Sequence, residues 1–234
     1  MKRYFRPIAL GTLVIVALGA FFNVETSTRR CVDYRCQSVR MPLYLKLTDF
    51  FDRHFNYVHL LKEIVKGAKT EEERVMRILA WAGTNIKEAP PGLPVMDDHV
   101  WYIIVRGYGV NDQLQDVFTT LCNYAGVDAF FQQVYTKDLK LQVPLSFVKI
   151  DKRWYLFDAY NSAFFTDNHG RMTDIEGMKS REWRAAFLPG GPRKPLDYSL
   201  FVDTLPLQYA TELGRSNTQS PLNRLLYELK KKDK

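Results

Sequence analysis

Apolar residues at helical spacing open the globular part of the chain. Between residues 41 and 68 they recur three or four positions apart, which predicts an amphipathic helix with a break near Asn56. His54 and His59 fall in this stretch, five positions apart. Because that spacing places them on different faces of a helix, we expect packing or solvent exposure for these histidines and no metal site.

A second helix and its end are both marked in the sequence. Thr70 and Glu73 have the spacing of a capping box. The prolines at positions 90, 91 and 94 stop this helix and require an extended or turning path. Residues 100–105 form a short apolar run, which we expect to be buried strand or coil. The apolar face of the second helix is predicted to consist of Val75, Ile78, Leu79 and Ala82.

The stretch RGYGVNDQLQDVFTTLCNYAGVDA, residues 106–129, predicts a third helix that follows a glycine-flanked turn. Gly126 closes this helix, so we expect it to run from about Asp112 to Tyr124. At its start, where a hydrolytic enzyme would display a nucleophile, the chain has Asn-Asp-Gln. The buried face is predicted to consist of Leu114, Val117, Phe118, Leu121 and Ala125.

Beyond the third helix the pattern changes to strands. Residues 128–136, 143–151 and 153–161 are rich in aromatic and β-branched side chains, and a turn at 151–153 makes the last two an antiparallel hairpin. The sequence therefore predicts an α+β fold, in which N-terminal helices pack on a small antiparallel β-sheet and the third helix is buried between them.

The C-terminal part of the chain gives weaker signals. From Asn161 onward we expect a loop-rich path, with a surface bend at 189–195 and a terminal helix at 220–232. The predicted domain occupies residues 41–200, and residues 201–234 form an extension with a basic tail.

The N-terminus has the pattern of a membrane-targeting segment. A basic leader at 1–6 precedes an uncharged run at 7–24, and those 18 residues would rise about 27 Å as a helix, just short of the roughly 30 Å hydrocarbon core. A cleavable signal peptide is one interpretation. We favour an uncleaved transmembrane signal anchor, because Leu18, Phe21 and Phe22 continue the apolar run past the small residues at which cleavage would occur. Residues 25–40 are then a juxtamembrane linker, and the body lies outside the cytoplasm, in the periplasm of a Gram-negative cell.

Composition and cysteine spacing narrow the possible partners. Hydrophobic residues at 46% exclude a disordered chain, and the net charge of +7 comes without any nucleic-acid-binding motif, so we expect no nucleic-acid partner. The basic tail is either a solvated helix end or a contact for anionic lipid. Cys31 and Cys36 could form a disulfide in an oxidising compartment or remain two thiols. No Cys or His pairs have zinc-ligand spacing, and we expect no metal or cofactor.

The order of these elements resembles the transglutaminase-like superfamily, a branch of the papain-like α+β folds. In that family a Cys heads a helix, a Gly-Ile/Val-x-Ala turn closes it, an H-A-W strand follows, and a last strand bears an aromatic residue and then Asp. Residues 126–129, Gly-Val-Asp-Ala, match the closing turn, and RWYLFDAYN matches the last strand through Trp154 and Asp158. The resemblance covers roughly residues 70–165 and rests on order and spacing.

The resemblance implies a catalytic triad of which one member is retained. Counting along the family pattern, the nucleophile position falls on Asn111 and the base position on Leu145, while Asp158 keeps the acid. An amide cannot replace a thiolate as nucleophile, and leucine carries no proton. Cys122 lies eleven positions after Asn111, about 16 Å along the helix, so we expect it to be a small core side chain instead.

Polar residues gather where the mouth of the cleft is expected. In one interpretation they cap the third helix and tie the proline loop to it, with Asp112 at the first-turn N–H groups. In the other they line a retained groove, where Arg106 binds a carboxylate and Tyr160 and Trp154 stack on a sugar or peptide; Trp154 could equally pack beneath the hairpin. The candidate binding residues are Asp98, His99, Arg106, Asp112, Gln113 and Tyr160.

Three functions are compatible with this pattern. The first is a membrane-anchored, catalytically inactive transglutaminase-like domain that binds or scaffolds another envelope protein, a peptide or a polysaccharide. The second is an active amide or glycan hydrolase that uses Asp98, Asp112 or Asp158 with His99. The third is a structural accessory subunit of a membrane protein complex. We favour the first, because the residues that acyl transfer requires are absent from their expected positions.

Overall fold

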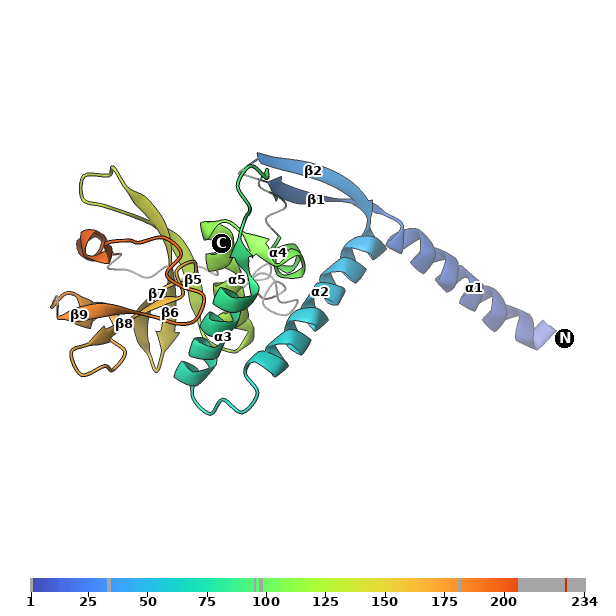
Figure 1. Ribbon diagram of the computed structural model, residues 1–234. Helices are drawn as coiled ribbons and strands as arrows, with labels where there is room; N and C mark the ends of the chain where they lie inside the picture. Colours follow the sequence, from blue (N-terminus) through green and yellow to red (C-terminus); the bar gives the residue numbers. More distant parts are fainter. Residues whose placement is uncertain are drawn as a thin grey trace.

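A computed structural model describes residues 2–32, 35–94, 96, 99–180, 182–205 and 226, and all of their side chains except those of 2–9, 29 and 31. A long helix, α1 (Lys2–Phe22), projects from a body of helices and strands (Figure 1). The candidate residue Asp98 lies outside the described residues, as does the predicted helix at 220–232 apart from residue 226.

The segment after α1, predicted to be a juxtamembrane linker at 25–40, forms a hairpin. Strand β1 (Glu25–Val32) pairs antiparallel with β2 (Arg35–Pro42). In this register Cys31 lies directly opposite Cys36, and Cys36 is disulfide-bonded. The predicted pairing with Cys31 fits this register, because directly opposite residues of two strands approach closely enough for a disulfide. Within the described residues, no helix combines the length and the apolar character needed to cross a bilayer.

The first two helices of the body follow the hydrophobic pattern. Helix α2 (Leu43–Ile64) is continuous, so the predicted break at Asn56 was wrong: the Asn56 amide donates to Asp52, a contact that spans one turn of an unbroken helix. Helix α3 (Glu71–Asn85) begins as predicted, because the Thr70 hydroxyl accepts from the Glu73 N–H. All four apolar residues predicted for its inner face are buried.

The apolar run at 100–105 is a helix, contrary to the expected strand or coil. Helix α4 (Val100–Arg106) begins where His99 Nδ1 accepts from the Trp101 N–H, and it ends at Gly107, whose φ of 71° is left-handed. Val100 and Ile103 are buried whereas Val105 is exposed, which is helical spacing. The apolar run at 100–105 is too short for its sequence to distinguish the 3.6-residue period of a helix from the two-residue period of a strand.

Short parallel strands connect these helices to the next one. Strand β3 (Lys87–Glu88) pairs with β4 (Tyr108–Gly109). Helix α5 (Asn111–Tyr124) follows directly and packs against α2, α3, α4, β5 and β6. Four of the five residues predicted for its buried face are fully buried; Ala125, at the C-terminal cap, is half-buried.

The main sheet has five antiparallel strands in the order β5-β6-β7-β8-β9. The three predicted strands are present, and Asp151 and Lys152, both with positive φ, form the predicted turn between the second and the third. The expectation of a loop-rich chain after Asn161 was wrong, because two further strands of five residues each extend the sheet. The strands are β5 (Ala129–Tyr135), β6 (Gln142–Ile150), β7 (Arg153–Asp158), β8 (Ala163–Asp167) and β9 (Trp183–Phe187).

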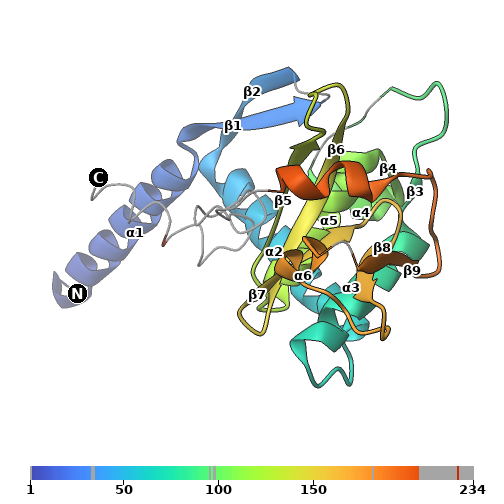
Figure 2. The same ribbon diagram turned by 90° about the vertical axis from the view of Figure 1, so that its left-hand side faces the viewer.

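The sheet separates two cores. One core lies between the sheet and helices α2 to α5, and the other lies on the opposite face. Figure 2 shows α6 (Ile175–Met178) and the turns η1 (Tyr198–Leu200) and η2 (Val202–Thr204) in front of the strands, with α5 behind them. The predicted architecture, in which helices pack on an antiparallel β-sheet, is thus confirmed, and residues 113–122 of α5 are buried.

Candidate functional site

The start of α5 is held by its own side chains. Val110, the residue before the helix, has no capping side chain, but its N–H donates to Gln113 Oε1 at 3.2 Å. The Asp112 carboxylate accepts from the Gln113 N–H at 3.0 Å. Asp112 therefore has the capping contact expected of it, with its negative charge at the positive end of the helix.

Arg106 and Gln113 connect this helix start to the preceding loops. The guanidinium of Arg106 donates to Gln113 Oε1 at 2.7 Å and to the Tyr108 carbonyl at 2.8 Å. Gln113 in turn donates to the carbonyl of Met96, in the proline-containing loop. These bonds favour the interpretation in which the polar residues fasten the loop to α5. They engage the planar donor groups that would otherwise bind a carboxylate.

Gln115, one turn into α5, is the centre of a buried polar cluster. Its amide nitrogen donates to Asn111 Oδ1 at 3.1 Å and to Asp158 Oδ1 at 2.9 Å. Its amide oxygen accepts from the Ser146 hydroxyl at 2.7 Å and from the Ala159 N–H at 3.0 Å. Gln115 is fully buried, so one side chain joins α5 to strands β6 and β7 without contact with water.

Asp158, at the end of β7, accepts from four further groups. Its Oδ1 receives the N–H groups of Tyr160 and Asn161, and its Oδ2 receives the Asn161 amide and the Tyr198 hydroxyl, both at 2.8 Å. The carboxylate is fully buried. Burial, together with the charge of Asp158, raises the pKa of Tyr198, which keeps the phenol protonated as a donor.

Of the three triad positions expected from the sequence, the structure brings two together. Asn111 and Asp158 are joined through Gln115, whereas Leu145 belongs to the core on the opposite face of the sheet. The neighbouring Ser146 is the residue of β6 that faces α5. Successive side chains of a strand point to opposite faces of the sheet, so a shift of one position along β6 changes the face. The prediction of Leu145 as the base position was therefore wrong, because its side chain lies on the face away from α5.

Tyr160 is part of the protein interior, contrary to its expected role as a stacking surface. It is 6% exposed, its hydroxyl donates to Glu88, and the Arg193 guanidinium lies 5.5 Å from the ring centroid. Burial and the Glu88 contact raise the pKa of Tyr160 to about 12. Trp154 is half-buried and lies 5.3 Å from the Phe130 ring, between ring centroids, which favours the packing interpretation.

The remaining nucleophile and base candidates lie elsewhere. Cys122 is fully buried, as predicted, and burial raises the pKa of its thiol. His99 caps α4, and His54 contacts the Tyr124 hydroxyl at 3.2 Å. Among the residues that the structure describes, no group of three or more His, Cys, Asp or Glu side chains could hold a metal ion.

The order of helix, strands and buried acid agrees with a family model. Residues 58–159 match the transglutaminase-like superfamily. The chain contains a transglutaminase-like domain. The matched segment begins within α2 and ends directly after Asp158, so it includes α5 and the first three strands of the main sheet, but neither α1 nor the hairpin of β1 and β2.

Solved structures similar to this chain are distant. A proposed cysteine protease from Cytophaga hutchinsonii has 14% identity and a TM-score of 0.40, with 57% of this chain and 47% of that chain covered. A proposed protease from Parabacteroides distasonis has 12% identity and a TM-score of 0.38, with coverages of 58% and 36%. A TGase has 10% identity and a TM-score of 0.38, with coverages of 62% and 46%. The chain thus spans less than half the length of each, and no curated protein matches it.

The sequence did not identify four members of the buried polar cluster around Asp158, namely Gln115, Ser146, Asn161 and Tyr198. One signal was available for Gln115, which follows Asn111 by four positions and therefore lies on the same helical face. A polar residue on the buried face of a helix needs a hydrogen-bond partner. The other three come from separate elements, and only the fold brings them to Asp158.

A cavity of about 580 Å³ lies away from this cluster. It is bounded by the loop between β5 and β6, by Trp183 at the start of β9 and by the turns η1 and η2. None of its lining residues belongs to the cluster around Asp158.

Proposed function

We propose that this chain is a catalytically inactive transglutaminase-like domain, attached to a membrane, that acts as a binding or scaffolding module in the cell envelope. One observation supports the proposal that the domain is catalytically inactive. The fully buried Gln115 connects Asn111 and Asp158, where the family pattern expects a nucleophile and an acid, and it also binds Ser146, the residue of β6 next to the expected base position Leu145.

The chemistry of these groups supports inactivity. Acyl transfer near neutral pH needs a nucleophile and a base that removes its proton. The donors that surround Asp158 are amides, hydroxyls and backbone N–H groups, none of which is a base at neutral pH. The Ser146 hydroxyl is fully buried and donates to an amide oxygen, which does not activate it.

The hydrolase alternative receives less support from the described residues. His99 Nδ1 accepts from a backbone N–H at the start of α4, and the Asp112 carboxylate accepts from another at the start of α5. Both side chains thus have capping roles on different helices, whereas general acid–base catalysis requires groups positioned on one substrate.

Membrane attachment is supported by the composition and exposure of α1. Its described side chains from Leu10 onward are all exposed, and they are predominantly large and apolar; Ile15, for example, is 71% exposed. An apolar surface of this extent is unfavourable in water and marks an interaction site. The preceding basic residues, at positions 2, 3 and 6, suit the headgroup region of a bilayer.

We expect the purified chain to turn over no amide, ester or glycosidic substrate. The assay compares wild-type protein with the variants Asp98→Asn and Asp112→Asn, which remove two of the three carboxylates named for an Asp–His mechanism; the third, Asp158, is fully buried. Equal, background-level signals for all three proteins support the proposal. Wild-type turnover that either substitution abolishes, while the variant remains folded by circular dichroism, establishes the hydrolase instead.

A further inference from the structure

Helix α2 carries a second apolar surface, next to α1. Tyr44, Phe51 and Phe55 are 42%, 45% and 64% exposed. Their spacings of seven and four residues place them on one face of the helix, which we call the aromatic stripe. Leu45, also exposed, adjoins it.

The aromatic stripe ends at Phe55, the thirteenth of the 22 residues of α2, and so occupies the part of the helix nearest α1. Four residues after Phe55 the same face continues with His59, and the exposed positions beyond it are polar. In the part that carries the stripe, Thr48 and Asp52 are also exposed, and Asp52 accepts from Asn56. The exposed residues of α2 beyond the stripe are His59, Lys62 and Glu63.

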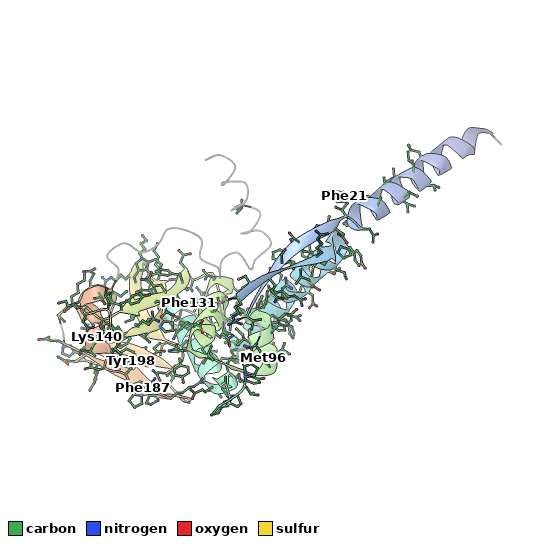
Figure 3. All side chains as sticks on the ribbon, turned by 90° about the horizontal axis from the view of Figure 1, so that it is seen from above. Phe21, Met96, Phe131, Lys140, Phe187 and Tyr198 are labelled. Carbon is green, nitrogen blue, oxygen red and sulfur yellow. The ribbon has the colours of Figure 1, made fainter. Side chains whose placement is uncertain are left out.

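The positions of α1 and of the body relative to α2 show on which side of α2 a membrane would lie. α1 leaves the molecule at the N-terminal end of α2 and diverges from it, with the body on the other side of α2 (Figure 1). Phe21 lies where α1 meets the hairpin, far from Tyr198 on the body (Figure 3). A bilayer that receives α1 would therefore extend along α2 on the side away from the body.

We propose that the aromatic stripe rests in the headgroup region of the bilayer that holds α1, so that the part of α2 from Tyr44 to Phe55 lies along the membrane surface and the part beyond it leads away into water. This inference rests on the proposed membrane attachment and adds the orientation of the body. The exposed apolar residues of α1 continue through Val24 to Tyr44, and the backbone N–H of Leu43 donates to the Val24 carbonyl, which ties the two surfaces together. A helix with aromatic residues on one face is suited to the interface of a bilayer.

A lipid surface fits this stripe better than a second protein. The exposed apolar residues end at Phe55, about one turn along α2 from Phe51, as the helix leads away from α1. A protein docked on α2 would not require its apolar surface to end with distance from α1. The polar residues that follow, Lys62 among them, suit contact with water beyond the headgroups.

The test uses the full chain in lipid nanodiscs, with Cys31 and Cys36 replaced by Ser. Phe55→Cys carries an environment-sensitive fluorophore, and Lys62→Cys, seven positions along the same face, is the matched control. We expect a blue-shifted emission at position 55 that brominated lipid quenches, and neither effect at position 62. Both positions are exposed, so the substitutions leave the core intact.

Two other outcomes overturn the inference in different ways. If the chain incorporates but the two labels have equally water-exposed emission, or the label at position 55 shifts without quenching by brominated lipid, the stripe contacts water or protein and only the orientation fails. If the chain does not associate with the nanodiscs, the proposed membrane attachment fails as well.

Discussion

Replacing Asp158 by alanine should lower the free energy of unfolding by about 4 kcal/mol. The carboxylate receives five hydrogen bonds, from Gln115, Tyr160, Asn161 twice and Tyr198, and it is fully buried. Alanine leaves these donors without an acceptor in a place that water does not reach. An unsatisfied buried donor costs more than the bond it loses, because its desolvation is no longer offset.

Asp128→Ala is the matched control for this loss. Asp128 is exposed, and it follows α5 in the same segment of the domain. We expect its substitution to change the free energy of unfolding by at most about 0.5 kcal/mol. Urea denaturation of both variants measures the difference. Equal stabilities would mean that Asp158 is solvated and free, as a catalytic acid awaiting a partner would be.

Gly190→Ala should cost a similar amount, about 4 kcal/mol, through the backbone. Gly190 has a φ of 102°, which disfavours any residue with a Cβ, and an added Cβ would lie 2.4 Å from the carbonyl oxygen of Gly83 in α3. Arg193, three residues on, donates to the same carbonyl. The segment 189–193 thus packs directly on the end of α3, and a methyl group would separate them.

Gly67→Ala is the matched control, because it tests the cost of a positive φ without a steric contact at the added Cβ. Gly67 also has a positive φ, of 79°, but no atom lies within 4 Å of its added Cβ. The expected loss is therefore only the cost of the left-handed backbone, about 1 kcal/mol. Thermal unfolding that gives equal losses for the two variants would show that the 189–193 segment does not press on α3.

Elements with a long, regular pattern could be predicted from the sequence, and short ones could not. The faces of α3 and α5 and the hairpin of β6 and β7 follow local rules of spacing and turn chemistry. Strands β8 and β9 depend on pairing with neighbours for their hydrogen bonds. A five-residue run contains too few repeats to reveal that it will be paired.

The sequence predicted the positions of Asn111 and Asp158 in the candidate site, but not the other side chains that surround Asp158. Spacing from the closing turn placed Asn111 at the start of α5 and Asp158 at the end of a strand, and the structure joins them. The error at Leu145 reflects the two-residue period of a strand, in which one position decides the face. Tyr198 reaches Asp158 from 40 positions away, which no local pattern reports.

The central claim is that Asn111 marks the vacated nucleophile position at the head of α5, and the alkylation rate of Asn111→Cys tests it most directly. The chain again has Cys31 and Cys36 replaced by Ser, so that the native Cys122 is the internal reference. At a helix N-terminus the macrodipole favours the thiolate, whereas burial raises the pKa of Cys122. We expect the thiol at position 111 to alkylate faster than Cys122 in the folded protein, and the variant to remain without turnover because no base faces it. A thiol at position 111 that is no more reactive than Cys122 would contradict the vacated-site account.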